Sequence, residues 1–218
     1  MMIPFLDELR SYGIEPRHAL HVGAHVGAEY SMYRDADCEV RYIEANPDVY
    51  KTLIENVPPE CCENVAVSDH LGQIDLHVTS MDQSSSVLPL KEHSEIYPTI
   101  VHERTVTVPC VTIDDIRRRV GRPFDFLNID IQGAELIAFR GAGQVLSEVD
   151  AVMSEVNRAE LYEGCALMPE VDRHLRAAGL IRVRESFAYH ESWGDALYVR
   201  RRYVSMFDRL IHRVRRVA

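Results

Sequence analysis

The chain has 218 residues and a mass of 24.9 kDa, with 46% hydrophobic and 27% charged residues. This length fits one domain, and the composition can fill a hydrophobic core, which excludes a disordered polymer. The net charge of −10 is unevenly divided: residues 200–218 contain seven Arg and one acidic residue, and the remaining net −16 would repel the phosphates of a nucleic acid.

Short apolar runs alternate with segments of helical periodicity, which is typical of βαβ units and a mainly parallel sheet. The first part of the chain predicts strands over 18–22, 40–45 and 64–68 and helices over 28–34 and 48–56. The pair Asn46-Pro47 indicates a helix start, with a capping side chain followed by proline at the first helical position.

From residue 72 to 111 the pattern changes to strand-like alternation, over 74–78 and 105–111. A polar, serine-containing stretch lies between these two runs. We therefore expect an antiparallel β/loop insertion around 72–111, and long loops of this kind are usually functional or mobile.

The α/β alternation then resumes and indicates a Rossmann-like domain over 1–202 with helices on both faces of the sheet. The helices are predicted over 113–120, 134–146 and 168–178, and the strands over 124–131, 151–156, 180–187 and 196–201.

The tail over 203–218 predicts a basic amphipathic helix, with an apolar stripe that includes Val204, Phe207 and Val214 and with Arg on the other sides. Such a helix could cover the acidic body, form a homodimer contact or make a peripheral contact with an anionic membrane. The chain has an odd number of cysteines, no CxxC pair, no signal-peptide pattern and no apolar run of membrane-spanning length. We expect a reduced, cytoplasmic protein.

In an open parallel sheet, ligands bind at the carboxyl ends of the strands. The first strand ends in a turn with Gly23 and Gly27, and Glu44 ends the second strand, 21 residues after Gly23. An acid at this spacing is placed to accept hydrogen bonds from ribose hydroxyls, which indicates a nucleoside cofactor. The turn lacks the GxGxxG of a dinucleotide site, and no GxxxxGK[ST] is present, so S-adenosylmethionine, which has no phosphate, fits best.

A second constellation follows the fourth strand, where Asp130, Gly133 and Glu135 bring two carboxylates to the same edge. An acid at the end of an apolar strand needs a partner there, whereas Glu135 is also explained by the helix N-terminus. Glu155 ends the fifth strand in the same way, with a salt bridge to Arg158 as the alternative explanation. The three carboxylates could hold Mg²⁺, but their spacing does not require it, and no metal site is predicted.

The runs HVGAHVGAEYSMY, YIEANPDVY, NVAVSD, FLNIDIQGAELIAFRGA and WGDALYVRR occur in the order found in FkbM-type enzymes. Over about residues 18–202 the chain resembles this branch of the class I S-adenosylmethionine-dependent methyltransferases, with the motif over 130–142 the most specific part. The resemblance implies a seven-stranded sheet whose last strand is antiparallel. It also implies O-methylation of a hydroxyl on a sugar, glycan or polyketide-type metabolite.

Transferred by position, the resemblance implies that Gly23 and Gly27 flank the methionine part of the cofactor, that Glu44 holds the ribose, and that Asp130 lies beside the reacting methyl. The other cofactor-binding residues that it implies are Ala24, His25, Tyr30, Ala45, Asn46, Val67, Ser68 and Ser85. His21 is also among them, but here the chain departs from the family pattern, which usually has an acid at this position. A histidine cannot replace that carboxylate as the acceptor for the cofactor's ammonium group.

A sugar hydroxyl is a poor nucleophile, so alignment of the reactants should be combined with a general base. The candidates are Asp130, Glu155, His102 and His190, the last expected in a loop between the final two strands. Trp193 could stack on a sugar face or pack in the core.

Two other functions remain open at this point. A nucleic-acid methyltransferase could use the Arg-rich tail, although the acidic body and the absence of an (N/D/S)PP(Y/F/W) motif argue against it. A non-catalytic, S-adenosylmethionine-binding partner subunit would keep the pocket and show no turnover. We expect a small-molecule or glycan acceptor and no nucleic-acid partner.

Overall fold

A computed structural model of the chain describes residues 4–204. Seven strands form the main sheet in the order β3-β2-β1-β7-β8-β10-β9. Their bounds are β1 (His18–Val22), β2 (Glu39–Ile43), β3 (Cys62–Glu63), β7 (Phe126–Ile129), β8 (Ala151–Asn157), β9 (Leu180–His190) and β10 (Trp193–Arg200). β10 is antiparallel to both of its neighbours, and the other pairs are parallel. The predicted Rossmann-like sheet with an antiparallel last strand is confirmed.

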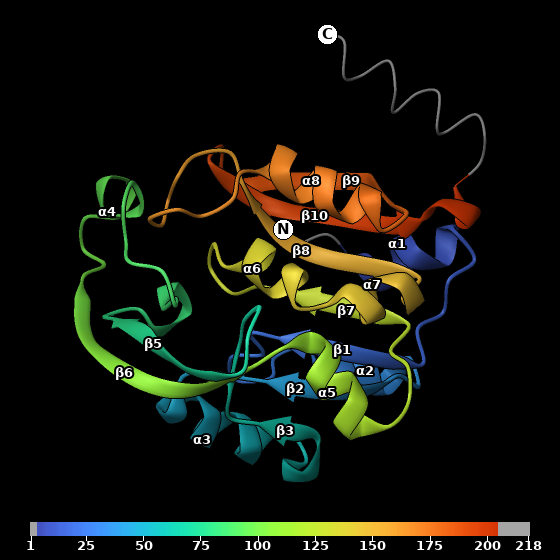
Figure 1. The fold of residues 1–218 in the computed structure, drawn as a ribbon, viewed down its shortest axis with the longest axis horizontal. Coiled ribbons are helices and arrows are strands. Elements are labelled where there is room, and N and C mark those ends of the chain that lie inside the picture. The colour runs from blue at the N-terminus through green and yellow to red at the C-terminus, as the bar shows by residue number, and fades with distance from the viewer. Residues whose placement is uncertain (1–3, 205–218) are drawn as a thin grey trace, which may run out of the picture.

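The helices other than α4 (His93–Ile96), which lies in the insertion, cover both faces of this sheet (Figure 1). They are α1 (Phe5–Ser11), α2 (Tyr30–Asp35), α3 (Pro47–Asn56), α5 (Ile113–Val120), α6 (Glu135–Arg140), α7 (Gly143–Glu148) and α8 (Met168–Ala177). Successive strand residues point to opposite faces, so Leu127 packs with α5–α8 in one core cluster while Phe126 packs with α1–α3 in the other. Two hydrophobic cores therefore hold the sheet between two helical layers.

The insertion forms a second sheet of three strands beside the main sheet (Figure 1). Its order is β4-β6-β5, with bounds β4 (Ala66–Val67), β5 (Gly72–Thr79) and β6 (His102–Val111). β5 and β6 are antiparallel, as the alternating pattern predicted. Short 3-10 helices complete the chain: η1 (Pro59–Cys61), η2 (Asp82–Ser84) and η3 (Arg201–Tyr203).

The strand predicted over 64–68 is confirmed only at Ala66–Val67, and it does not join the main sheet. The third strand of the main sheet is β3, and β4 pairs instead with β6 in the insertion. Between them, the side-chain amide of Asn64 donates to the carbonyl oxygens of Glu44 (2.8 Å) and Ala45 (3.2 Å). These bonds hold the chain where it leaves one sheet and enters the other.

The single helix predicted over 134–146 is wrong, because Gly141 and its neighbours divide it into α6 and α7. A side chain at Gly141 would place Cβ 2.4 Å from the carbonyl oxygen of Ser68, so the position at which α6 ends has room only for glycine. The Asp114 carboxylate then accepts the backbone N–H groups of Gln144 (3.0 Å) and Val145 (2.9 Å), which provides α7 with the N-terminal hydrogen bonds that a local cap would supply.

Local helix signals are borne out elsewhere. The Asn46 side chain accepts from Asp48 N–H at the start of α3, with Pro47 at the first helical position. Gly179, after α8, has a φ of +88°, the left-handed conformation expected there. Between residues 4 and 204, no helix is both long and apolar enough to cross a membrane. From residue 205 onward, the predicted tail helix lies outside the residues that the structure describes.

Candidate functional site

The carboxyl ends of β1, β2, β7 and β8 open into one cavity of about 700 Å³, within the range of small-molecule sites. The insertion supplies another part of the wall, from Met81 through Val87, and β10 supplies Trp193 and Asp195. The cavity therefore lies where the sheet topology predicts a ligand, with the insertion beside it.

The turn after β1 has unusual backbone geometry, with positive φ at Gly23 (+79°), His25 (+48°) and Gly27 (+77°). A Cβ at Gly23 would lie 1.7 Å from the carbonyl oxygen of Asp130, and a Cβ at Gly27 would lie 2.6 Å from Val57. The sequence assigned these glycines to close approach of a ligand. The structure adds a second reason, which is close packing of this turn against the end of β7 and against α3, and Gly23 also lines the cavity.

Glu44 connects two backbone segments at the cavity wall. Its carboxylate is largely buried, and its two oxygens accept the N–H groups of His25 (2.9 Å) and Asn46 (2.8 Å). Burial raises the pKa of Glu44, while these two hydrogen bonds oppose the rise. The second lone pair of each oxygen is available to a ribose hydroxyl.

The predicted cofactor-binding residues fall into two groups. Those that line the cavity are His21, Gly23, Ala24, His25, Glu44, Ala45, Asn46, Val67, Ser85 and Asp130. Gly27, Tyr30 and Ser68 lie outside its lining, and the Ser68 hydroxyl contacts His70 instead (3.1 Å).

His21 is buried in an uncharged environment. Its ring packs against Tyr33 and Tyr42 at centroid distances of 5.9 and 6.0 Å, and Nε2 lies 3.3 Å from Asn128 Nδ2. Burial lowers its pKa to about 4, so the ring is neutral near pH 7. It cannot supply the negative charge of the acid that it replaces.

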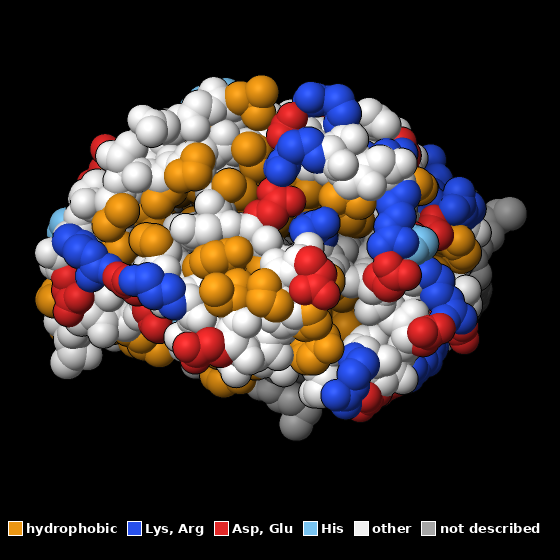
Figure 2. Space-filling view, turned by 90° about the horizontal axis from the view of Figure 1, so that it is seen from below, with side chains coloured by type: hydrophobic (Ala, Val, Ile, Leu, Met, Phe, Trp, Pro, Cys, Tyr) orange, Lys and Arg blue, Asp and Glu red, His pale blue; other side chains and the backbone are white. Residues whose placement is uncertain are grey.

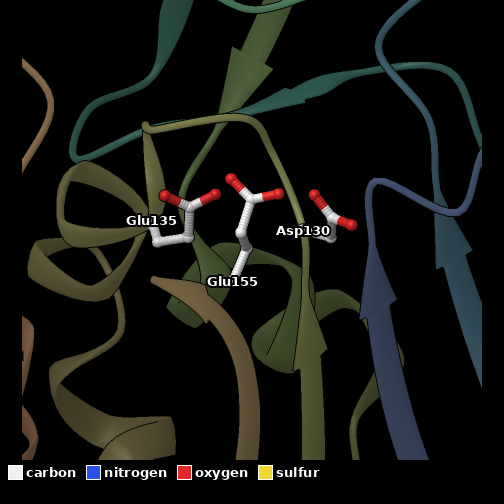
Figure 3. Close-up of side chains that lie close together, drawn as sticks. All are labelled: Asp130, Glu135 and Glu155. Atoms are coloured by element: carbon white, nitrogen blue, oxygen red, sulfur yellow. The ribbon is translucent and has the colours of Figure 1, made fainter. Parts of the chain in front are cut away.

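The three predicted carboxylates converge at the ends of β7 and β8, with Glu155 between Asp130 and Glu135 (Figure 3). One oxygen from each lies within 4.8 Å of the others. Glu135 accepts the N–H groups of Ile131 (3.0 Å) and Gly133 (3.2 Å), so it closes the turn into α6 and does not line the cavity. Asp130 and Glu155 both line it.

Gln132 links the two carboxylates that line the cavity. Its Nε2 donates to Asp130 Oδ1 and to Glu155 Oε2, both at 2.8 Å. The Tyr162 hydroxyl in turn donates to Gln132 Oε1 at 2.8 Å. The expected alternative for Glu155, a salt bridge with Arg158, is wrong because Arg158 pairs with Glu185 at 3.2 Å. Gln132 and Tyr162 were not predicted as site residues from the sequence, although Gln132 lies inside the motif over 130–142.

The clustering of acids shifts their protonation. Burial raises the pKa of Glu135 to about 7, and burial together with the charges of Asp130 and Glu135 raises the pKa of Glu155 well above its usual range. Asp130 faces the open cavity; surrounding protein raises its pKa, while hydrogen bonds from Gln132 and Glu155 lower it. Of the two carboxyl groups that line the cavity, Glu155 is the one whose pKa burial and neighbouring charges raise well above its usual range, so Glu155 is the one driven more strongly toward its protonated form.

Within residues 4–204, the carboxylates of Asp130, Glu135 and Glu155 together form a cluster that could hold an oxygen-preferring cation such as Mg²⁺. The Gln132 amide already bridges Asp130 and Glu155, and nothing in the geometry requires an ion.

The two histidine candidates for the base lie outside the cavity lining. His102 is exposed at the start of β6. The prediction that His190 lies in a loop is wrong, because β9 and β10 extend until only two residues separate them. Its Nδ1 accepts the N–H of Ser192 (3.1 Å), and its ring lies 6.2 Å from that of Tyr97.

Comparison with known proteins gives one family and several similar structures. The sequence model of the methyltransferase FkbM domain matches residues 21–181. The 2-O-methyltransferase NoeI of Sinorhizobium fredii is 30% identical over 108 residues, which are 46% of this chain and 44% of NoeI. The match thus spans less than half the length of that relative.

Two solved structures align with most of this chain at low sequence identity. Magnesium protoporphyrin IX methyltransferase (ChlM) of Synechocystis PCC 6803 with bound SAM aligns with a TM-score of 0.48 and 11% identity, over 90% of this chain and 76% of ChlM. A putative tRNA (m1A22) methyltransferase, Sp1610 of Streptococcus pneumoniae, aligns with a TM-score of 0.49 and 12% identity, over 95% of this chain and 75% of that protein.

Proposed function

The chain belongs to the FkbM methyltransferase family, and from this premise we propose that it is an S-adenosylmethionine-dependent O-methyltransferase of an uncharged, hydroxyl-bearing acceptor such as a sugar, a glycan or a polyketide-type metabolite. The observation that carries the proposal is one cavity whose lining contains both Glu44, at the expected ribose position, and Asp130, at the expected position of the reacting methyl. NoeI, whose name gives 2-O-methyl transfer, supports the choice of oxygen as the methylated atom.

The charge of the cavity supports both the methyl donor and the acceptor class. Its acidic lining residues are Glu29, Glu44, Asp82, Asp130, Glu155 and Asp195, and no Lys or Arg belongs to its lining among the described residues. An acidic cavity attracts a sulfonium cation and repels acceptors that carry phosphate or carboxylate. On the face shown in Figure 2, basic side chains lie beside acidic ones, and this mixed surface is not what a nucleic-acid partner requires.

Asp130 is the residue that we assign to proton transfer. S-adenosylmethionine supplies an activated methyl group on its sulfonium, so the chain needs to align the acceptor oxygen with that methyl and remove its proton. Gln132 donates to both Asp130 and Glu155 and so holds the Asp130 carboxylate in place at the cavity. Asp130 then accepts the hydroxyl proton as the new C–O bond forms.

The cofactor assignment is tested by calorimetry with S-adenosylhomocysteine. We expect binding by the unmutated chain and roughly 10- to 100-fold weaker binding by Glu44→Gln, because a buried acceptor of charge-assisted hydrogen bonds contributes about 1.5–3 kcal/mol. Glu103→Gln, an exposed acid on β6 outside the cavity, is the matched control and should bind normally. Absence of binding by the unmutated chain would refute the cofactor assignment.

Catalysis is tested separately, by release of S-adenosylhomocysteine from S-adenosylmethionine in the presence of neutral polyhydroxylated acceptors. Asp130→Asn should reduce turnover by about 10²- to 10⁴-fold, the usual contribution of a general base. Cofactor binding without turnover on any acceptor would instead identify a non-catalytic partner subunit.

A further inference from the structure

Two aromatic side chains form a stacked pair at the edge of the cavity. Tyr189, near the end of β9, and Trp193, the first residue of β10, have ring centroids 5.7 Å apart and an interplanar angle of 12°. Both residues line the cavity. We refer to Tyr189 and Trp193 as the aromatic platform.

The platform is rigid on one side and open on the other. The indole N–H of Trp193 donates to the hydroxyl of Tyr97 (3.2 Å), and Trp193 packs against the buried cluster that contains Leu161 and Tyr162. Tyr189, by contrast, is 64% exposed and is one of the most exposed large apolar side chains in the described chain. An aromatic ring held against a fixed partner, with its surface open to a cavity, is suited to stack on a ligand.

A row of carboxylates leads from the platform to the proposed reaction centre. Asp195 follows Trp193 by two residues, so both side chains lie on the same face of β10, roughly 7 Å apart along the strand. Asp195 is paired with Glu155 across the β10–β8 ladder, and Gln132 joins Glu155 to Asp130. This spacing is comparable to the width of one hexose ring.

We propose that the aromatic platform is the acceptor subsite and that it binds a neutral sugar ring, whose C–H face stacks on the exposed ring of Tyr189, with Trp193 stacked behind that ring, while the edge hydroxyls of the sugar point toward Asp195, Glu155 and Asp130. A sugar has both required surfaces, an apolar face and a rim of hydroxyl donors that carboxylates can accept. A planar phenolic acceptor could stack as well, but its few hydroxyls would leave most of the carboxylate row unpaired. The cavity lining, without Lys or Arg in the described residues, does not favour a sugar acid or sugar phosphate.

This inference rests on the proposed function and deepens it, and it can be tested by binding alone. Trp193 is the single tryptophan of the chain, so its fluorescence reports directly on the platform. The full chain, saturated with S-adenosylhomocysteine, is titrated with a panel of methyl glycosides of neutral hexoses and 6-deoxyhexoses, with glucuronic acid and with catechol. We expect a saturable change in emission with at least one neutral glycoside, and none with glucuronic acid.

Variants identify the role of the exposed ring. Tyr189→Ala should weaken binding of that glycoside roughly 3- to 10-fold, the size of an aromatic stacking contact, whereas Tyr189→Phe should retain it. S-adenosylhomocysteine affinity should be unchanged in both variants, and Leu71→Ala, an exposed apolar residue outside the cavity, should bind glycoside normally.

The outcomes separate this inference from the proposed function. Loss of S-adenosylhomocysteine binding in the unmutated chain would refute the proposed function itself. If that binding is intact, a saturable response to catechol but to no neutral glycoside would overturn the sugar subsite alone. Equal glycoside affinity of Tyr189→Ala and the unmutated chain would do the same. A panel that gives no saturable response at all would overturn it too.

Discussion

His21 makes the stability of the fold sensitive to acid in a way that can be calculated. Its ring lies among Tyr33, Tyr42 and Asn128, none of which carries a charge near pH 7, and its Nδ1 has no hydrogen-bond partner among residues 4–204. Burial lowers its pKa from 6.5 to about 4. The unfolded chain therefore binds a proton at this residue more readily than the folded chain does.

The sign follows from linkage. Because the folded pKa is depressed, the stabilising contribution is complete above pH 6.5 and decreases as the pH falls toward 4. At pH 5 the contribution lost is about 2 kcal/mol, and its limiting value is about 3 kcal/mol, since one pKa unit corresponds to about 1.4 kcal/mol. For a domain of this size, 2 kcal/mol corresponds to roughly 4–8 °C in Tm.

The assay is thermal unfolding of the unmutated chain and of His21→Gln, at pH 7.5 and at pH 5. Gln is neutral throughout this range, so the fall in Tm between the two pH values should be roughly 4–8 °C smaller in the variant. His102→Gln, in which an exposed histidine of β6 is replaced, should keep the pH dependence of the unmutated chain. The reasoning is refuted if His21→Gln loses as much Tm on acidification as the unmutated chain.

Two further predictions concern the edge of the sheet. Gly23→Ala should prevent folding or cost more than about 3 kcal/mol, measured by chemical denaturation, because its Cβ would lie 1.7 Å from the Asp130 carbonyl oxygen at a φ of +79°; near-normal stability would contradict the packing of this turn. Glu135 has a folded pKa raised to about 7, so its contribution is complete below pH 4.5 and is lost as the pH rises through 7, by about 3 kcal/mol at pH 8. Glu135→Gln keeps an oxygen that can accept the N–H groups of Ile131 and Gly133 but removes the titrating carboxyl group. In denaturant titrations, the stability of this variant should therefore change less between pH 5 and 8. An unchanged dependence of stability on pH would show that Glu135 does not titrate in this range.

The sequence by itself determined the parts of the protein that depend on local periodicity. The α/β alternation, the antiparallel insertion and the cap at Asn46 were predicted because side-chain burial repeats every two residues in a strand and every 3.6 in a helix. The same pattern located Glu44 and Asp130, because the end of an apolar run marks the end of a strand, and parallel strands end at one edge of the sheet.

The tertiary structure decided what those residues contact. The link from Tyr162 through Gln132 to Glu155 joins residues 30 and 23 positions apart, and no local pattern contains it. The same holds for Gly141, which lies close to Ser68 at the point where a helix that the periodicity predicted as continuous is divided. Contacts between distant segments also showed that Gly23 packs against the Asp130 carbonyl oxygen, a second requirement for glycine that the sequence did not reveal.

The end of the β9–β10 hairpin shows the division most clearly. Sequence alone identified two terminal strands and the single tryptophan, but pairing continued to His190 and Trp193 and so converted an expected loop into strand. That extension places Tyr189 and Trp193 in a stack at the cavity. The two-residue repeat of apolar side chains determines which segments are strands. How far each strand extends depends on hydrogen bonds with a partner strand, and only the folded chain brings that partner into place.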